Sequence, residues 1–489
     1  MDLQQSLWLI FPEIIIIITI IVVVLAELIL PPQKRHQTGW FAATGLVAAF
    51  FVTLNLFKVD TAAEFFGRMV VHDAWSLFFK LFFEISGFLI VIFSLGSKET
   101  RGKNQGEYYA LLLAVIMGLI FMTSATDLVM ILLAMETVGI LSYVLVGFNK
   151  ASSRSGEAAL KYLIYGATAT GVMLFGMSYL YGLTGTTNLF DIADSIAQSE
   201  TGFTLTVIML FILVGFGFKI AMAPFHMWCP DVYEGAPTPI TAFLSVGPKA
   251  AGFALLLRFF FSTLTQPALD GAFTVVGTFK WPLLIAILSA FTMTVGNLSA
   301  ITQSNVKRLL AYSSIAHAGY MLMGVVVLHT AGLRAILFYL IVYLFMNIGA
   351  FMVVAAIRDG IGSEEIDDYK GIGRRMPFAP IMLALFLFAL TGLPPLSGFI
   401  GKFYLFFAVI DAGIYWLVTV AIINTVISLY YYARIVKAMF FDEGSQTTPV
   451  PVTPLQIIVV SISAIPTLIL GIYWAPIIDF AEQSIQMLM

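Results

Sequence analysis

Cysteine and cofactor-binding motifs are almost absent from this sequence. Cys229 is the single cysteine among 489 residues, which excludes an internal disulfide and a cluster of cysteine ligands. We find no GxGxxG run followed by an acidic residue and no phosphate-binding loop. The chain therefore has no evident site for a flavin, a nicotinamide, an iron-sulfur centre or ATP. His226 lies near Cys229 without further ligands nearby, so we expect no metal site there.

Charge is also scarce. Charged residues make up 11% of the chain and apolar residues 60%, with a mean hydropathy of +0.96. Soluble domains carry about 25% charged residues. The apolar runs have the length of about 20 residues that a membrane helix needs, not the roughly 10-residue alternation of a barrel strand. The sequence predicts an all-α polytopic membrane protein. The net charge of −3 gives no sign of nucleic-acid binding.

Fourteen transmembrane spans are predicted from apolar runs between charged or glycine- and proline-rich breaks. They cover residues 7–30, 40–57, 75–96, 108–125, 127–148, 158–183, 203–228, 237–261, 281–300, 309–328, 333–357, 378–411, 413–436 and 453–478. Because the number is even, both termini are expected on one side of the membrane.

Basic residues in the loops predict the orientation. Four of them fall on one side of the membrane: Lys58, Arg68, Lys280 and Arg334. Fifteen fall on the other side: Lys34, Arg35, Lys98, Arg101, Lys103, Lys150, Arg154, Lys307, Arg308, Arg358, Lys370, Arg374, Arg375, Arg434 and Lys437. Cytoplasmic loops are enriched in lysine and arginine. We therefore expect both termini to be periplasmic in a bacterial inner membrane.

Two spans contain proline and glycine within an apolar run, at residues 215–224 and 391–398. Proline lacks a backbone donor and clashes with the preceding turn, so we predict helix breaks at Pro224 and at Pro394 and Pro395. The breaks lie five spans apart, and an odd number of helices inverts a second copy, as in inverted-repeat transporters. The predicted parts are helices 1 to 3 in residues 1–107, a first repeat in 108–261, an inverted second repeat in 281–436 and a last helix in 437–489.

Ionisable residues inside the spans are the strongest functional signal. Glu136, Lys249 and Lys402 lie roughly 13 to 18 Å from the nearest span end, at ~1.5 Å per residue, and Lys219 lies beside the first break. A charge at the bilayer centre costs about 2.5 to 3.5 kcal/mol even on a lenient scale. Buried lysine and glutamate can exchange protons near neutral pH, whereas arginine stays charged. We predict that these four residues transfer protons. The alternative is a Glu136 and Lys219 pair that only fixes helix packing.

Two further residues are possible relays. Lys161, near the cytoplasmic end of its span, is either a proton-uptake relay or an anchor at the membrane surface. His317 falls between Lys249 and Lys402 in sequence order, and histidine titrates near neutrality. It either bridges them or is simply a hydrogen-bonded core residue. The other intramembrane charges are expected to be structural or interfacial: Glu13, Glu27, Lys80, Glu84 and Arg258.

With these residues in place, the chain resembles the antiporter-like membrane subunits of respiratory complex I. The matching stretches are residues 133–136, 304–314, 392–402 and above all 218–238, in which 231–237 is similar to the N-type branch. The resemblance implies that Glu136 is the family's helix-5 glutamate, Lys219 its helix-7 lysine, Lys249 its central helix-8 lysine and Lys402 its helix-12 lysine.

The resemblance also implies a function. Protons would cross from cytoplasm to periplasm, driven by quinone reduction in partner subunits that hold FMN, iron-sulfur clusters and quinone, with no redox site in this chain. The expected partners are a neighbouring antiporter-like subunit, small membrane subunits and the lipid bilayer. Two alternatives stay open: a subunit of a multisubunit cation/proton antiporter or membrane-bound hydrogenase, and a purely structural membrane subunit.

Overall fold

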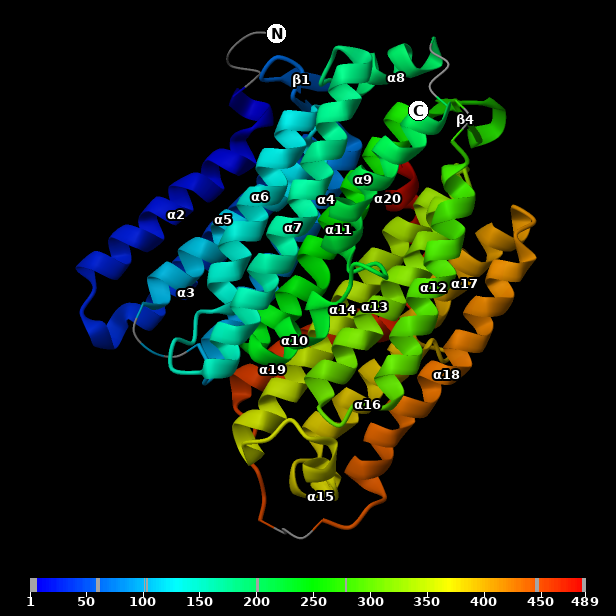
Figure 1. The fold of residues 1–489 in the computed structure, drawn as a ribbon. Helices are drawn as coiled ribbons and strands as arrows, with labels where there is room; N and C mark the ends of the chain where they lie inside the picture. Colours follow the sequence, from blue (N-terminus) through cyan, green and yellow to red (C-terminus); the bar gives the residue numbers. More distant parts are fainter. Residues whose placement is uncertain are drawn as a thin grey trace.

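The structure, a computed structural model, is a bundle of tilted α-helices with two short β-hairpins at loop ends (Figure 1). It describes residues 7–58, 62–100, 102, 104–198, 202–277, 279–444 and 448–485. Two of the basic loop residues counted above, Arg101 and Lys103, lie outside the described residues.

The helices follow the predicted spans in order. Their bounds, with the strands and 3₁₀ turns, are α2 Phe11–Ile29, η1 Pro32–Gln37, α3 Thr38–Leu56, β1 Ala63–Phe65, β2 Val70–His72, α4 Ala74–Gly96, α5 Gln105–Ser124, α6 Leu128–Val146, α7 Ser153–Thr184, α8 Leu189–Ala197, α9 Gly202–Ile220, α10 Trp228–Gly235, α11 Thr238–Leu264, β3 Thr265–Pro267, η2 Leu269–Gly271, β4 Phe273–Val275, α12 Trp281–Ile301, α13 Val306–Val325, α14 Thr330–Ile361, η3 Ile366–Tyr369, α15 Ile372–Arg375, α16 Phe378–Thr391, α17 Ser397–Asp411, α18 Tyr415–Phe440, α19 Pro454–Ile469 and α20 Ala475–Ile485.

Eleven helices of the described chain are long and apolar enough to cross a membrane. The predicted all-α polytopic membrane fold is confirmed. The remaining predicted spans correspond to α13, which carries many polar residues, and to shorter helices at the breaks and near the C-terminus. The number of fourteen crossings and the inverted relation of the repeats stay predictions.

The two β-hairpins, which the sequence did not predict, lie in loops at one end of the bundle. Strands β1 and β2 pair antiparallel with Ala63 opposite His72, and β3 and β4 pair with Thr265 opposite Val275. The first hairpin leads directly into α4, whose first turn is capped by Asp73 through a hydrogen bond from the Ser76 backbone N–H. These hairpins fix the loops at the end of the bundle where α2 begins (Figure 1).

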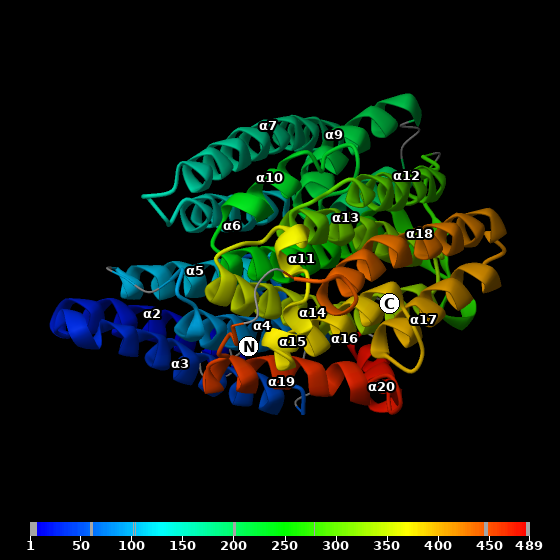
Figure 2. The ribbon, with the colours of Figure 1, turned by 90° about the horizontal axis from the view of Figure 1, so that it is seen from below.

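Helices α11 and α14 form the centre of the bundle (Figure 2). In α11, every residue of the most apolar stretch of 18 residues is buried. In α4 and in α14, 89% of the corresponding stretch is buried. Helices α2 and α3 cover α4 and α5 on one side, and α17 and α18 lie on the opposite side (Figure 2). Polar residues of α11 and α14 are therefore enclosed by other helices instead of facing lipid.

The last predicted span, 453–478, differs from the structure. The chain forms α19, a turn and then α20, instead of one continuous helix. Gly471 lies in the turn, and its backbone approaches the Pro395 carbonyl so closely that any side chain there would collide. The C-terminal helices thus bend around the second helix break, a contact that span hydropathy does not reveal.

Candidate functional site

The first helix break lies between α9 and α10. Helix α9 ends at Ile220, one residue after Lys219, and Ala221 takes a positive φ of 57°. The freed backbone groups have partners: Ala223 N–H donates to Thr292 Oγ1 at 3.1 Å, and Trp228 Nε1 donates to the Phe218 carbonyl at 3.1 Å. Such partners are needed because an unsatisfied polar group inside the membrane costs several kcal/mol.

The second break lies between α16 and α17, at Pro394 and Pro395. Helix α16 ends at Thr391, and the Lys402 ammonium donates to the Thr391 carbonyl oxygen at 2.8 Å. The carboxyl end of a helix carries partial negative charge, which favours a nearby cation. Both breaks thus fall in the fourth helix of each predicted five-helix repeat and lie beside a lysine.

The three predicted lysines are enclosed. Lys219, Lys249 and Lys402 are 3%, 1% and 4% exposed, respectively. Lys249 follows Pro248 in the middle of α11, and its ammonium donates to the Ser314 hydroxyl of α13. It also lies 5.7 Å from the ring centroid of Tyr233. Neutral partners of this kind solvate the ammonium. A carboxylate partner would instead hold it in the charged form.

His317 lies one helical turn after Ser314 on α13. Its Nδ1 is 2.7 Å from the Tyr339 hydroxyl, and its Nε2 is 3.5 Å from the Tyr432 hydroxyl. The Tyr432 hydroxyl also hydrogen-bonds to Ser313. His317 is therefore placed among hydroxyl groups from α14 and α18, each of which can both donate and accept.

The same face of α13 continues to Lys402. Tyr320, one further turn along α13, lies with its ring centroid 4.5 Å from the Lys402 ammonium. Lys402 also lines an apolar cavity of about 300 Å³ together with Phe403 and Phe406. Helix α13 thus presents Ser314, His317 and Tyr320 at i, i+3 and i+6 between the two lysines.

Glu136 and Lys219 lie on neighbouring helices but form no ion pair among the described residues. The Lys219 ammonium donates to the Met135 carbonyl at 3.2 Å, next to Glu136 in the chain. Glu136 itself is half-buried on α6. The Glu136 and Lys219 pair of the alternative interpretation is therefore not formed in this structure, in which the Met135 carbonyl accepts from Lys219 instead.

Lys161 of α7 lies in a charged cavity of about 190 Å³ that is also lined by Asp231 of α10 and Arg308 of α13. Its ammonium pairs with Glu157 at 2.8 Å and with Asp231 at 2.7 Å. Asp231 also pairs with Arg308 at 2.6 Å. Partial burial acts to raise the pKa of Asp231, but hydrogen bonds from Lys161 and Arg308 outweigh it and lower that pKa. The cavity therefore keeps an ionised carboxylate beside Lys161.

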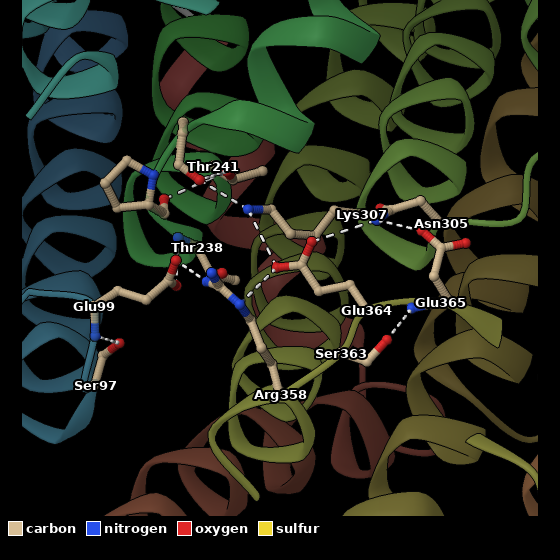
Figure 3. A network of polar contacts seen from close by, with 12 residues as sticks. Ser97, Glu99, Thr238, Thr241, Asn305, Lys307, Arg358, Ser363, Glu364 and Glu365 are labelled. Atoms are coloured by element: carbon tan, nitrogen blue, oxygen red, sulfur yellow. Dashed lines mark hydrogen bonds and ion pairs between the residues drawn. The ribbon is translucent and has the colours of Figure 1, made fainter. Parts of the chain in front are cut away.

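A second ionic network joins the two predicted repeats (Figure 3). Glu364 lies 3.6 Å from the buried Lys307 ammonium and 3.3 Å from Arg358, which also pairs with Glu99. Lys307 donates to the Ala236 carbonyl at 2.8 Å, and Glu99 accepts from the Thr238 backbone N–H at 2.9 Å. The junction of α10 and α11 is thereby tied to the start of α13 and the end of α14.

Other intramembrane charges have structural partners. Arg258 makes a bidentate contact with Asp73 at 2.8 and 2.9 Å, which ties α11 to the start of α4. Lys80 pairs with Glu13 of α2 at 2.7 Å and not with Glu84, one turn away on its own helix. The i, i+4 spacing of Lys80 and Glu84 suggested a pair, but the interhelical carboxylate lies closer.

Sequence reasoning missed the hydroxyl residues around the lysines, namely Ser314, Tyr320, Tyr339 and Tyr432. The first two share the helical spacing of His317, so polar periodicity within an otherwise apolar span was a usable signal. The tyrosines of α14 and α18 carry no such signal. No group of three or more potential metal ligands gathers within the part of the chain that the structure describes.

Comparisons with known proteins identify the family of this chain. The family described as NADH:quinone oxidoreductase/Mrp antiporter, TM matches residues 125–428. The chain is 42% identical to NADH-quinone oxidoreductase subunit N of Anaeromyxobacter sp. (strain Fw109-5), covering 99% of this chain and 98% of that protein. It is 44% identical to NADH-quinone oxidoreductase subunit N 2 of Chloroherpeton thalassium, covering 98% and 94%.

A solved structure is similar over the same length. A chain of respiratory complex I from Thermus thermophilus superimposes with a TM-score of 0.80 at 30% identity, covering 96% of this chain and 99% of that one. The sequence comparison and the fold comparison thus lead to one assignment. This protein belongs to the NADH:quinone oxidoreductase/Mrp antiporter family of membrane proteins, among its subunit N members.

Proposed function

We propose that this chain is a proton-translocating membrane subunit of an NADH-quinone oxidoreductase. The observation that carries the proposal is the set of enclosed lysines, two of which, Lys249 and Lys402, contact Ser314 and Tyr320 at either end of a row of polar side chains on α13. An ordinary scaffold has no need for unpaired ammonium groups in a membrane, where each costs several kcal/mol. Proton transfer uses them.

The proposed route begins at the charged cavity around Lys161 on the cytoplasmic side and loads Lys249. From there the proton passes along Ser314 and His317 to Lys402 and leaves toward the periplasm, where both termini lie. Residues three apart on a helix have Cβ atoms ~5 to 6 Å apart, a gap that one bridging water or a rotamer change closes. The hydroxyl groups near His317 extend the same chain of donors and acceptors.

Glu136 and Lys219 are proposed as the switch. When the Glu136 carboxylate approaches the Lys219 ammonium, the positive charge is held there; when they separate, repulsion acts on Lys249. At an effective dielectric near 20, unit charges ~8 Å apart interact by about 2 kcal/mol, which is enough to reverse the occupancy of a poised site. The Lys219 contact with the Met135 carbonyl represents the separated arrangement in this scheme.

The drive for this cycle is assigned to partner subunits. Flavin, iron-sulfur clusters and quinone are placed in those partners, together with a neighbouring antiporter-like subunit and small membrane subunits. Copurification from native membranes tests this directly, because redox-active subunits should accompany the chain. Purification of this chain as a solitary, fully active transporter would contradict the assignment.

Replacing Lys402 tests the far end of the route. We expect Lys402→Met to lower proton pumping and NADH-quinone turnover on the order of 100-fold, the usual contribution of a positioned proton-transfer group. NADH oxidation with an artificial acceptor should be unchanged, because it occurs in the partner subunits. Lys437→Met is the matched control, since this exposed lysine of α18 pairs, among the residues that the structure describes, only with Asp442 at 3.4 Å. Equal pumping by both variants would exclude Lys402 from the route.

Ser314 should have a smaller effect. We expect Ser314→Ala to slow coupled pumping about tenfold, because one hydrogen bond is worth roughly 1 to 1.5 kcal/mol and a water can replace the hydroxyl. Ser314→Thr restores the hydroxyl and should recover most of the rate. Ser86→Ala is the control, since the buried Ser86 hydroxyl donates to the carbonyl of its own helix at Phe83. A Ser314→Ala complex that pumps at the native rate would remove Ser314 from the route.

A further inference from the structure

A second group of buried ionisable residues lies in α2, α3 and α4, away from the lysine row. Lys80 and Glu84 of α4 and Glu13 of α2 are 2%, 1% and 6% exposed, respectively. These positions fall outside residues 125–428, the part of the chain that the family comparison matches. Neither the breaks nor the route through α13 uses them.

Charge balance in this group leaves one carboxyl group without a counter-ion. The Lys80 ammonium pairs with Glu13 Oε1 at 2.7 Å. Glu84 has no ion pair among the described residues, and its Oε2 is buried without a hydrogen-bond partner. A buried ionised carboxylate without a partner is strongly disfavoured and takes up a proton instead. The contacts therefore favour a neutral carboxylic acid at Glu84.

The hydrogen bonds of Thr53 support the same protonation state. Its hydroxyl oxygen lies 3.1 Å from the Ala49 carbonyl and 2.8 Å from Glu84 Oε1. A hydroxyl has one proton to donate. Both contacts are satisfied together when Thr53 donates to the Ala49 carbonyl and a protonated Glu84 donates to Thr53.

The charged groups around Glu84 also allow it to bind a proton. Lys80 and Glu13 are the charged groups that act on Glu84, and Glu13 Oε2 is itself buried with no hydrogen-bond partner from the described residues. The guanidinium that α11 brings to α4, that of Arg258, is occupied by Asp73. The Lys80 ammonium thus faces the carboxyl groups of both Glu13 and Glu84. When these two carboxyl groups hold one proton between them, the three side chains together carry no net charge.

His72 lies where α4 meets the end of the bundle. It is 2% exposed, and neither ring nitrogen has a hydrogen-bond partner in the described part of the chain. Burial, followed by the charge of Lys80, lowers the pKa of His72 to about 3. The imidazole is therefore neutral at physiological pH, with one nitrogen that donates and one that accepts.

We propose that α2, α3 and α4 hold a second proton-binding site, in which Glu84 carries a proton beside the Glu13 and Lys80 ion pair and exchanges it with the aqueous phase past His72. The site is independent of the lysine row, because no residue is shared between the two. Its ligand is a proton and not a metal cation, since the Lys80 ammonium already occupies the position facing the carboxylate.

Infrared difference spectroscopy of the assembled complex in lipid vesicles tests the site. A protonated carboxyl group has a C=O stretching band that a carboxylate lacks. We expect Glu84→Gln to remove one such band and Glu64→Gln to leave it, because Glu64 is exposed and pairs with Arg68 at 3.2 Å. Lys249→Ala should also leave the band, which separates this site from the proposed pumping route. Retention of the full band in Glu84→Gln would overturn the proposal.

Three further variants sharpen the test. Lys80→Met leaves both carboxyl groups without a counter-ion, so the band should gain intensity about two-fold; unchanged intensity would contradict the charge balance. His72→Phe should keep the band but slow its response to a pH jump, and a native response would exclude the route past His72. If the Glu84→Gln complex fails to assemble, Thr53→Val tests the site instead. Loss of the hydrogen bond between Thr53 and Glu84 must shift the frequency of the Glu84 band. An unshifted band would refute the site.

Discussion

Proton pumping is expected to fall on the order of 100-fold when Lys249 is replaced by alanine, the size of effect typical for a positioned proton-transfer group. Lys249 is buried in the middle of α11 and donates to Ser314, a neutral hydroxyl that relays a proton but does not store one in place of the lysine. NADH-quinone turnover should fall with pumping, whereas artificial-acceptor NADH oxidation is spared. Both rates are measured on complex assembled in native membranes.

Lys249→Arg separates charge from proton exchange. Arginine keeps the positive charge but does not release its proton at physiological pH, so this variant should also fail to pump. Lys58→Ala and Lys58→Arg are the controls, because Lys58 is exposed in a loop and donates to Asn55 Oδ1 at 3.5 Å. If Lys249→Ala and Lys249→Arg both pumped at the native rate, the central role proposed for Lys249 would be wrong.

The Arg258 and Asp73 contact should dominate the stability of the junction between α4 and α11. Arg258 is 2% exposed and Asp73 4%, so Arg258→Met leaves a buried carboxylate without its partner. Breaking one side of such a pair is expected to lower stability by about 3 to 5 kcal/mol. The loss is measured as the amount of subunit assembled in the membrane and as the midpoint of thermal unfolding.

The double variant Asp73→Asn with Arg258→Met should recover much of that loss, because no unpaired charge remains. Arg334→Met is the surface control: its contact with Glu482 at 3.0 Å is half-exposed and worth about 0 to 1 kcal/mol. If the single and double variants were equally unstable, packing and not charge pairing would hold the junction.

The helices were readable from the sequence because the membrane imposes one dominant rule. Each span must hide its backbone polar groups within a helix and present apolar side chains to lipid. That rule placed the helices in order and located the breaks at Pro224 and at Pro394 and Pro395, where proline cannot continue the hydrogen-bond ladder. It failed at residues 453–478, because the turn at Gly471 depends on a contact with Pro395.

Buried charge was equally visible, since lysine and glutamate are rare inside spans and stand out against apolar neighbours. Their partners were not visible. The i, i+4 spacing suggested Lys80 with Glu84, yet the ion pair joins Lys80 to Glu13, 67 positions earlier in the chain. An ion pair of Lys219 with Glu136 was one interpretation of the sequence, whereas in the structure Lys219 donates to the neighbouring Met135 carbonyl.

By itself, the sequence determined the all-α membrane fold, the helix breaks and the identity of the buried ionisable residues, because these follow from hydropathy and from local backbone chemistry. Only the tertiary structure decided that Ser314, His317 and Tyr320 of α13 lie between Lys249 and Lys402, and that Glu84 finds no counter-ion among the residues described. The physical reason is that helix packing brings together side chains far apart in sequence, and hydrogen bonds and ion pairs act only over a few ångströms.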